Sequence, residues 1–122
     1  MADIKLTNDA KTLLSKIYEI YKTRRERGLS IDDAKRFQVG KLREIAGELG
    51  WCLDDTCTVL RELRDAGLVT IGAVYTFRLN LSGIRYMESK ERQSRNKMKN
   101  WIGKIAKGIV SAIKFLFPYI HP

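Results

Sequence analysis

Apolar positions recur at helical spacing through the first half of the chain and predict four helices. Thr7 or Asn8 can cap the first helix, and Gly28 can end it in a left-handed conformation. The apolar positions of this helix are Leu13, Leu14, Ile17, Ile20 and Tyr21. Ser30 and Asp33 form a capping-box pattern, which predicts that a short second helix begins there. The apolar positions of the second helix are Ile31, Ala34 and Phe37.

Two longer helices are expected on either side of a short turn. Gly40 should break the chain before the third helix, which ends at Gly50. The apolar positions of the third helix are Leu42, Ile45, Ala46 and Leu49. A fourth helix runs from about Asp54 to Ala66 and ends at Gly67. Its buried positions are expected to be Thr56, Leu60 and Leu63.

The period of the pattern changes after the fourth helix. Residues 68–79 are rich in β-branched and aromatic side chains, with Gly72 and Ala73 between the two runs, which predicts a two-stranded hairpin. Asn80 can cap a further helix. The apolar positions of that helix are Leu81, Ile84 and Met87. We therefore expect a mostly α fold with a small β-hairpin.

The positive charge is concentrated near the end of the chain. Of the net charge of +9 over 122 residues, residues 1–92 carry +3 and residues 93–122 carry +6 without any acidic residue. The polar run KERQSRNK separates two apolar patterns near residues 91–96. This asymmetry predicts a domain over residues 1–92 and a basic C-terminal helix over residues 93–122.

The C-terminal segment has the pattern of an amphipathic helix. Polar residues follow one another at steps of three and four, at Lys97, Asn100, Lys104, Lys107, Ser111 and Lys114. The positions opposite are apolar and include Trp101, Ile102, Ile105, Ile109, Ile113 and Leu116. Such a helix can lie on an anionic membrane surface, pack on its own domain, form a homodimer or enter the groove of a target. Membrane disruption, as by cationic host-defence peptides, is a further alternative.

The residue inventory argues against an enzyme. His121 is the one histidine and lies beside the last residue, so no interior imidazole can serve a catalytic triad or a zinc site. Cys52 and Cys57 have neither redox nor zinc-ligand spacing, and we expect them to be buried thiols of a reduced protein. No glycine-rich phosphate loop is present. We therefore expect no catalytic residue, cofactor, metal site or small-molecule substrate.

The apolar pattern also bears on localisation. The first residues lack the apolar segment of a signal peptide, and no stretch approaches the ~18 apolar residues of a membrane-spanning helix. We expect a cytoplasmic protein, which the C-terminal helix would bring to the inner face of the membrane if it binds lipid.

Three segments carry a resemblance to a known superfamily. The sequence LREIAGELGW, then DDTCTVLRELRDAGLV, then VYTFRLNLSGIRYM resembles the helix–turn–helix and wing of the winged-helix superfamily. The most specific positions are Leu63, Gly67 and Leu68, which would lead into the first wing strand, and a second set that leaves the wing, Phe77, Leu79, Asn80 and Gly83. The match covers about residues 42–87. The long first helix is similar to additions in small uncharacterised winged-helix proteins of Gram-positive bacteria and their phages.

The resemblance implies a DNA-binding regulator of transcription, with the fourth helix in the major groove and the wing on an adjacent groove or phosphate. Base-facing positions would be Asp54, Asp55, Cys57, Thr58 and Arg61. The candidate DNA-binding residues are Thr58, Arg61, Arg64, Lys41, Arg43, Arg78, Arg24 and Arg25.

The charge of the implied reading surface opposes this function. Residues 39–80 hold five basic and six acidic residues, a net charge of −1, and the wing tip IGAVY has no cation. A dimer could instead present the basic run at residues 22–27 to DNA, or the C-terminal segment could supply the charge. That basic run could equally be a solvated helix face. The alternative function is a protein-interaction module that the C-terminal helix tethers to a membrane surface.

Overall fold

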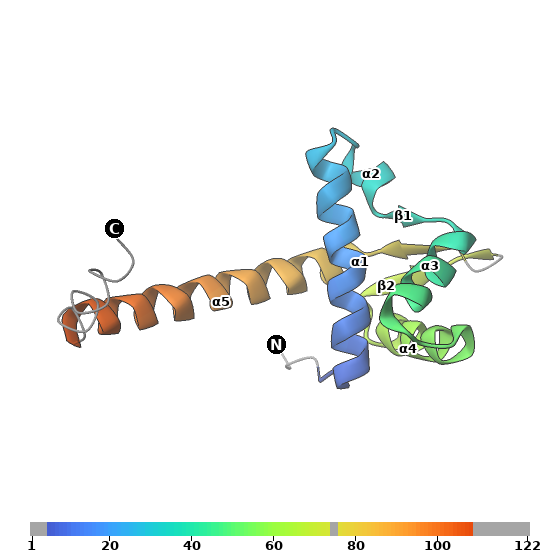
Figure 1. Cartoon of the computed structure of the whole chain (residues 1–122). Helices are drawn as coiled ribbons and strands as arrows, with labels where there is room; N and C mark the ends of the chain where they lie inside the picture. Colours follow the sequence, from blue (N-terminus) through green and yellow to red (C-terminus); the bar gives the residue numbers. More distant parts are fainter. Residues whose placement is uncertain (1–4, 74–75, 109–122) are drawn as a thin grey trace, which may run out of the picture. The chain divides into compact units, whose positions relative to one another are not determined.

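The structure, a computed structural model, describes residues 5–73 and 76–108 and confirms a mostly helical fold with a small antiparallel sheet (Figure 1). In chain order the elements are α1 (Asn8–Glu26), α2 (Ile31–Ala34), β1 (Arg36–Phe37), α3 (Val39–Leu49), α4 (Leu53–Asp65), β2 (Val69–Ile71), β3 (Phe77–Leu79) and α5 (Leu81–Gly108). The chain divides into two compact units, Met1–Met87 and Glu88–Pro122. The core described below belongs to the first unit.

Helix α1 forms as its sequence pattern predicts. The Thr7 hydroxyl oxygen accepts a hydrogen bond from the Ala10 amide at 3.2 Å, so Thr7 rather than Asn8 is the cap. Gly28 follows the helix with a φ of +94°, in the left-handed region. The buried side chains of α1 are Ala10, Leu13, Leu14, Ile17, Tyr18 and Tyr21. This face packs mainly against α4.

The segment after α1 differs from the prediction. Helix α2 is one turn long, with Ser30 accepting from the Asp33 amide, and Phe37 lies in a strand instead of continuing the helix. The Phe37 ring stacks on Phe77 with centroids 4.7 Å apart, which places β1 beside β3. The sheet therefore has three strands, in the order β1-β3-β2, where the sequence predicted two. Gly40 lies in the first turn of α3 and does not break the chain.

Helices α3 and α4 are joined by the three residues 50–52. Gly50 adopts a φ of +73°, and the Trp51 amide donates to the Ala46 carbonyl at 2.9 Å, which ends α3. Helix α4 starts one residue earlier than predicted and contacts α1, α3 and β2. Its buried positions, Thr56, Leu60 and Leu63, are those that the sequence predicted. The Thr56 hydroxyl donates to the Cys52 carbonyl at 2.9 Å, which satisfies the one polar group buried on this face.

Asn80 directly precedes α5 as predicted, and its carbonyl accepts from the Ile84 amide at 3.0 Å, but its side chain bonds to residues before the helix. Its side-chain oxygen accepts from the Thr70 hydroxyl at 2.6 Å, and its side-chain amide nitrogen donates to the Gly67 carbonyl at 3.3 Å. The first turn of α5 then approaches the backbone closely at Gly83. A Cβ atom there would lie 2.5 Å from the Leu68 carbonyl oxygen and 2.8 Å from Leu79 Cδ1. Only glycine fits at this position without displacing backbone.

We expect Gly83→Ala to lower the free energy of unfolding by about 1–3 kcal/mol, because the added methyl group overlaps a carbonyl oxygen that cannot move independently. Gly47→Ala in α3 is the matched control, since a Cβ atom there meets no atom within 4 Å. It should raise the free energy of unfolding by about 0.5–1 kcal/mol through the higher helix propensity of alanine. Urea denaturation monitored by circular dichroism measures both. Equal effects of the two substitutions would contradict the close approach at Gly83.

Candidate nucleic-acid interface

Helix α4 presents a polar face opposite its buried face. Asp54, Thr58, Arg61 and Asp65 are spaced by four, three and four residues, so they lie along one line of the helix, and all four are exposed. The buried face packs on α1, α3 and β2, and this packing fixes which side of α4 points to solvent. Helix α3 precedes α4 and is joined to it by the three-residue turn that contains Gly50.

Most of the acidic side chains between residues 39 and 80 form a hydrogen bond or an ion pair within the fold. Glu62 accepts from both the amide and the hydroxyl of Thr7, at 3.0 and 2.8 Å, which ties α4 to the start of α1. Glu48 lies 2.7 Å from the Lys16 ammonium group, and this hydrogen bond lowers the pKa of Glu48 below its usual value. The other two occupied acids are Glu44, paired with Lys41 at 3.0 Å, and Asp65, paired with Arg64 at 3.2 Å.

The charges that stay free differ from the total charge of the segment. Asp54 and Asp55 are the acids of residues 39–80 that have no side-chain partner in the described part of the chain. Three exposed arginines of the same segment also have none, namely Arg43, Arg61 and Arg78. Glu62 keeps its charge because its partner groups on Thr7 are neutral, so the three arginines face the charges of Asp54, Asp55 and Glu62 in this region.

The remaining candidates in α3 and α4 are already engaged. Lys41 is half-buried and holds Glu44, and Arg64 holds the neighbouring Asp65. The exposed Thr58 hydroxyl donates to the Asp54 carbonyl at 3.1 Å. An exposed ion pair contributes little to stability, so Lys41 and Arg64 can exchange their partners for a phosphate at small cost. Arg43 and Arg61 have no such contact to give up.

Arg24 and Arg25 have structural contacts at the end of α1. The Arg24 guanidinium donates to the carbonyl oxygens of Ala34 and Arg36 and lies 4.6 Å from the centroid of the Phe37 ring. Arg25 donates to the Leu29 carbonyl at 2.8 Å. Both were predicted from the sequence as DNA contacts. The hydrogen bonds instead indicate that they hold the backbone of residues 29–36, which follows α1.

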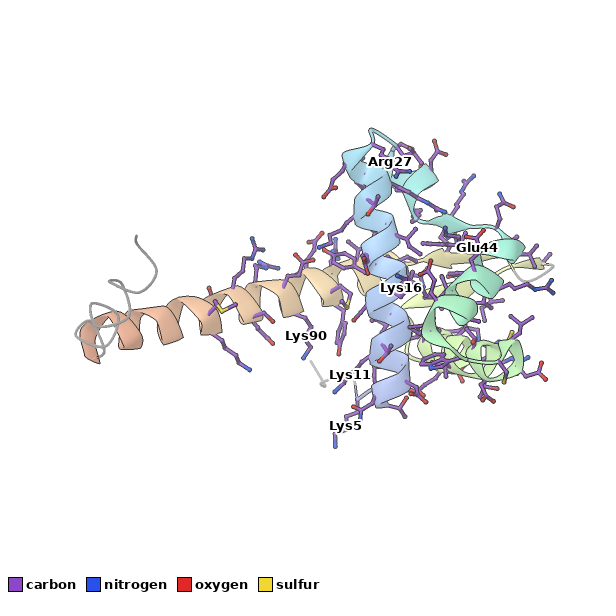
Figure 2. The ribbon with its side chains drawn as sticks, viewed as in Figure 1. Lys5, Lys11, Lys16, Arg27, Glu44 and Lys90 are labelled. Atoms are coloured by element: carbon purple, nitrogen blue, oxygen red, sulfur yellow. The ribbon has the colours of Figure 1, made fainter. Side chains whose placement is uncertain are left out.

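The cations of α1 do not gather at one place. Figure 2 shows Arg27 at one end of the helix, Lys11 near the other end and Lys16 between them. Lys16 is paired with Glu48, and Lys22 lies over the Tyr18 ring with 5.1 Å between its nitrogen and the ring centroid. The basic run at residues 22–27 therefore contains several side chains with contacts inside the fold.

The sequence missed Arg36 as a site residue, because it placed Phe37 in a helix. Arg36 is directly opposite Arg78 in the pairing of β1 with β3, and both side chains are exposed. The available signal was the alternation of polar and apolar residues from Arg36 to Val39, which has the period of a strand.

A hollow of about 390 Å³ lies between the starts of α3 and α4. Val39 and Leu53, which line it, are 48% and 37% exposed, and Arg43 and Asp54 also border it. Cys57 lines the hollow and is half-buried, whereas Cys52 is exposed, which corrects the expectation of two buried thiols. Apolar groups in this position could contact thymine methyl groups or a protein side chain.

The C-terminal candidates are described only in part. Helix α5 remains helical from Lys97 through Gly108, and Lys97 is exposed. For Trp101, Ile102, Ile105, Lys104 and Lys107 the structure gives the helical backbone alone. Ile109, Ile113, Leu116 and Lys114 lie outside the described residues. Within residues 5–73 and 76–108, no helix has a stretch both long and apolar enough to cross a bilayer.

We expect Arg24→Ala to lower the free energy of unfolding by about 1.5–3 kcal/mol, because two carbonyl groups lose a charged donor. Arg27→Ala is the control at the same end of α1, since the Arg27 side chain has no contact among the described residues, and it should change stability by less than about 0.5 kcal/mol. Thermal and urea unfolding of the two variants measure the difference. Stability unchanged by Arg24→Ala would rule out the structural role and return Arg24 to the candidate contacts.

Comparison of the chain with protein-family models, with curated proteins and with solved structures found no match.

Proposed function

We propose that the chain is a non-enzymatic winged-helix protein that binds duplex DNA and regulates transcription. The order of a helix, a three-residue turn, a second helix and a β-hairpin supports this proposal. In such a protein α4 enters the major groove, and the hairpin of β2 and β3 reaches the adjacent backbone. The proposed DNA contacts on the helices are Arg43 in α3 and Arg61 in α4. Thr58, which lies on the same exposed face of α4 as Arg61, is a third proposed contact.

The proposal is supported by the charges that the fold leaves without partners. Four of the six acids between residues 39 and 80 form a hydrogen bond or an ion pair, and three arginines of that segment have no partner among the described residues. A protein that binds DNA through several phosphates needs several cations on the contact surface. Arg36, immediately before this segment, adds a fourth free guanidinium. Of these four acids, Glu48 is paired with a cation from outside the segment, Lys16, and this pair lowers the repulsion that the sequence count implies. The attraction to a phosphate backbone would come from the four arginines without partners.

The number of free arginines sets the expected strength of binding. Each neutralised phosphate contributes about −0.9 to the slope of log K against log salt concentration. Four contacts give a slope of roughly −3.6, which corresponds to about a hundredfold loss of affinity between about 50 and 200 mM salt. Asp54 and Asp55 reduce the affinity further because they lie beside the groove-facing end of α4.

We expect the intact chain to bind a short mixed-sequence duplex with this salt dependence. Arg61→Ala should reduce the magnitude of the slope by about 1. Asp54→Asn should raise affinity by roughly two- to fivefold, since it removes a repulsive charge of the order of 0.5–1 kcal/mol. Fluorescence anisotropy of a labelled duplex over a salt series measures all three proteins, with Arg27→Ala as the control.

Two results would oppose this function. The first is an absence of duplex binding at about 50 mM salt, where phosphate contacts are strong. The second is an equal loss of affinity in Arg61→Ala and Arg27→Ala, because the effect would then reflect net charge alone.

The course of α5 favours a second candidate function, that of a protein-interaction module held at an anionic membrane surface. The backbone is helical through Lys97, Lys104 and Lys107, so the spacing that aligns these positions falls within a helix. Residues 92–98 are exposed, and Met98 is 60% exposed. A basic helix with apolar residues between its lysines has the composition of an interfacial helix.

We expect the intact chain to sediment with vesicles that contain phosphatidylserine. Replacing Lys97, Lys104 and Lys107 by glutamine should weaken partitioning by about a hundredfold, at about 1 kcal/mol for each lysine. The control replaces Lys5, Lys11 and Arg27 by glutamine, which removes the same charge elsewhere. Sedimentation that is equal for the two triple variants would show that the C-terminal helix is not the membrane anchor.

A further inference from the structure

The exposed face of the sheet brings two arginines together. Arg36 in β1 is the direct partner of Arg78 in β3, and Thr70 in β2 is the partner of Arg78 on its other side. Directly opposite residues of an antiparallel pair have Cβ atoms roughly 4.5–5.5 Å apart and point to the same face. All three residues are exposed, whereas the next pair, Phe37 and Phe77, is buried on the opposite face.

This pairing is electrostatically unfavourable in the protein alone. Like charges directly opposite one another destabilise a sheet. Neither arginine side chain has a partner in the described residues. The nearby Asp32 is held by Lys35 at 3.0 Å, and this contact is the main reason that the pKa of Asp32 lies below its usual value; the charges of Arg36 and Arg78 lower it further. The Asp32 carboxylate therefore offsets part of the repulsion between the two guanidinium groups, but no hydrogen bond or ion pair joins it to either of them.

A hollow of about 330 Å³ lies beside the two arginines. No acidic side chain lines it among the residues that the structure describes, and its polar lining includes Gln38, Thr70 and Thr76. The Thr70 hydroxyl donates to Asn80, and the Thr76 hydroxyl donates to the Ala73 carbonyl at 2.9 Å. The free donors of the hollow are consequently the two guanidinium groups and the Gln38 amide, which suits an oxyanion.

The backbone beneath this pair is firmly held. Arg24 donates to the carbonyl of Arg36, and the Leu79 amide donates to the Lys35 carbonyl at 2.9 Å. On the buried face the rings of Phe37 and Phe77 are nearly parallel, with an interplanar angle of 6°. These contacts keep the two arginine positions in register before any ligand binds, which reduces the entropy lost on binding.

We propose that Arg36 and Arg78 together bind a phosphate-type oxyanion, and that the phosphodiester backbone of duplex DNA supplies it. This inference rests on the proposed function and assigns a backbone contact to strand β1 as well as to the hairpin. Two guanidinium forks offer more N–H groups than one carboxylate can accept, whereas a duplex strand presents one phosphate for about every 3.4 Å of helix axis. Binding would also relieve the repulsion between the two arginines.

The test compares the intact chain with the double variant Arg36→Gln, Arg78→Gln. The magnitude of the salt slope for a short duplex should fall by about 2 in the double variant, with at least a tenfold loss of affinity at about 50 mM salt. The control is Lys11→Gln, Arg27→Gln, which removes the same charge and should change the slope by less than half as much. The unfolding midpoint of the double variant should be no lower than that of the parent, because a repulsion is removed.

A second arm separates the sources of the anion. Titration with inorganic phosphate, followed by the Nε–Hε signals of the arginines, reports binding at this pair without DNA. If the double variant binds the duplex as well as the control variant does, the proposed oxyanion site at Arg36 and Arg78 is wrong, but the proposed DNA-binding function is not contradicted. A parent chain that binds inorganic phosphate at Arg36 and Arg78 but no duplex would overturn both the DNA-binding function and the backbone as the source of the anion.

Discussion

The docking of β1 against β3 is the contact on which the rest of the arrangement depends. A strand of two residues gains little from its own ladder, so other interactions must place it. The Phe37 ring meets both the Phe77 ring and the Arg24 guanidinium, and Arg24 also binds the carbonyl of Arg36. These contacts join the end of α1 to the sheet and set the register in which Arg36 faces Arg78. The proposed oxyanion site is thus a consequence of how the core closes.

Contacts within the fold also determine which charged side chains have partners. Glu62 and Glu48 join α4 and α3 to α1, and Glu44 and Asp65 hold cations on their own helices. Carboxylates engaged in this way contribute less negative potential at the exposed face than free ones. Within residues 36–78, the arginines without a partner among the described residues are distributed over α3, α4 and the sheet. A segment with a net charge of −1 can therefore still offer a set of cations to a phosphate backbone.

Local patterns predicted most of the fold and less of the candidate site. The cap at Thr7, the left-handed glycines and the buried positions of α4 follow from rules within one helix turn, so they were accessible from the sequence. Strand β1 was missed because the alternation over residues 36–39 is too short to outweigh the helical pattern before it. Its position depends on the stacking of Phe37 on Phe77, forty residues further along the chain. The same limit explains Arg24 and Asn80. Both have side chains whose partners are set by tertiary packing, and spacing along the chain gives no sign of those partners.

The arginines divide into a group that binds within the fold and a group without partners among the described residues, and one NMR spectrum distinguishes the two groups. The Nε–Hε signals of the arginines in the intact chain can be recorded before and after addition of a short duplex at low salt. The signals of Arg36, Arg61 and Arg78 should shift while that of Arg24 stays in place, since Arg24 remains bound to its carbonyl partners. A shift confined to Arg24 and Arg25, with those three signals unchanged, would contradict this division.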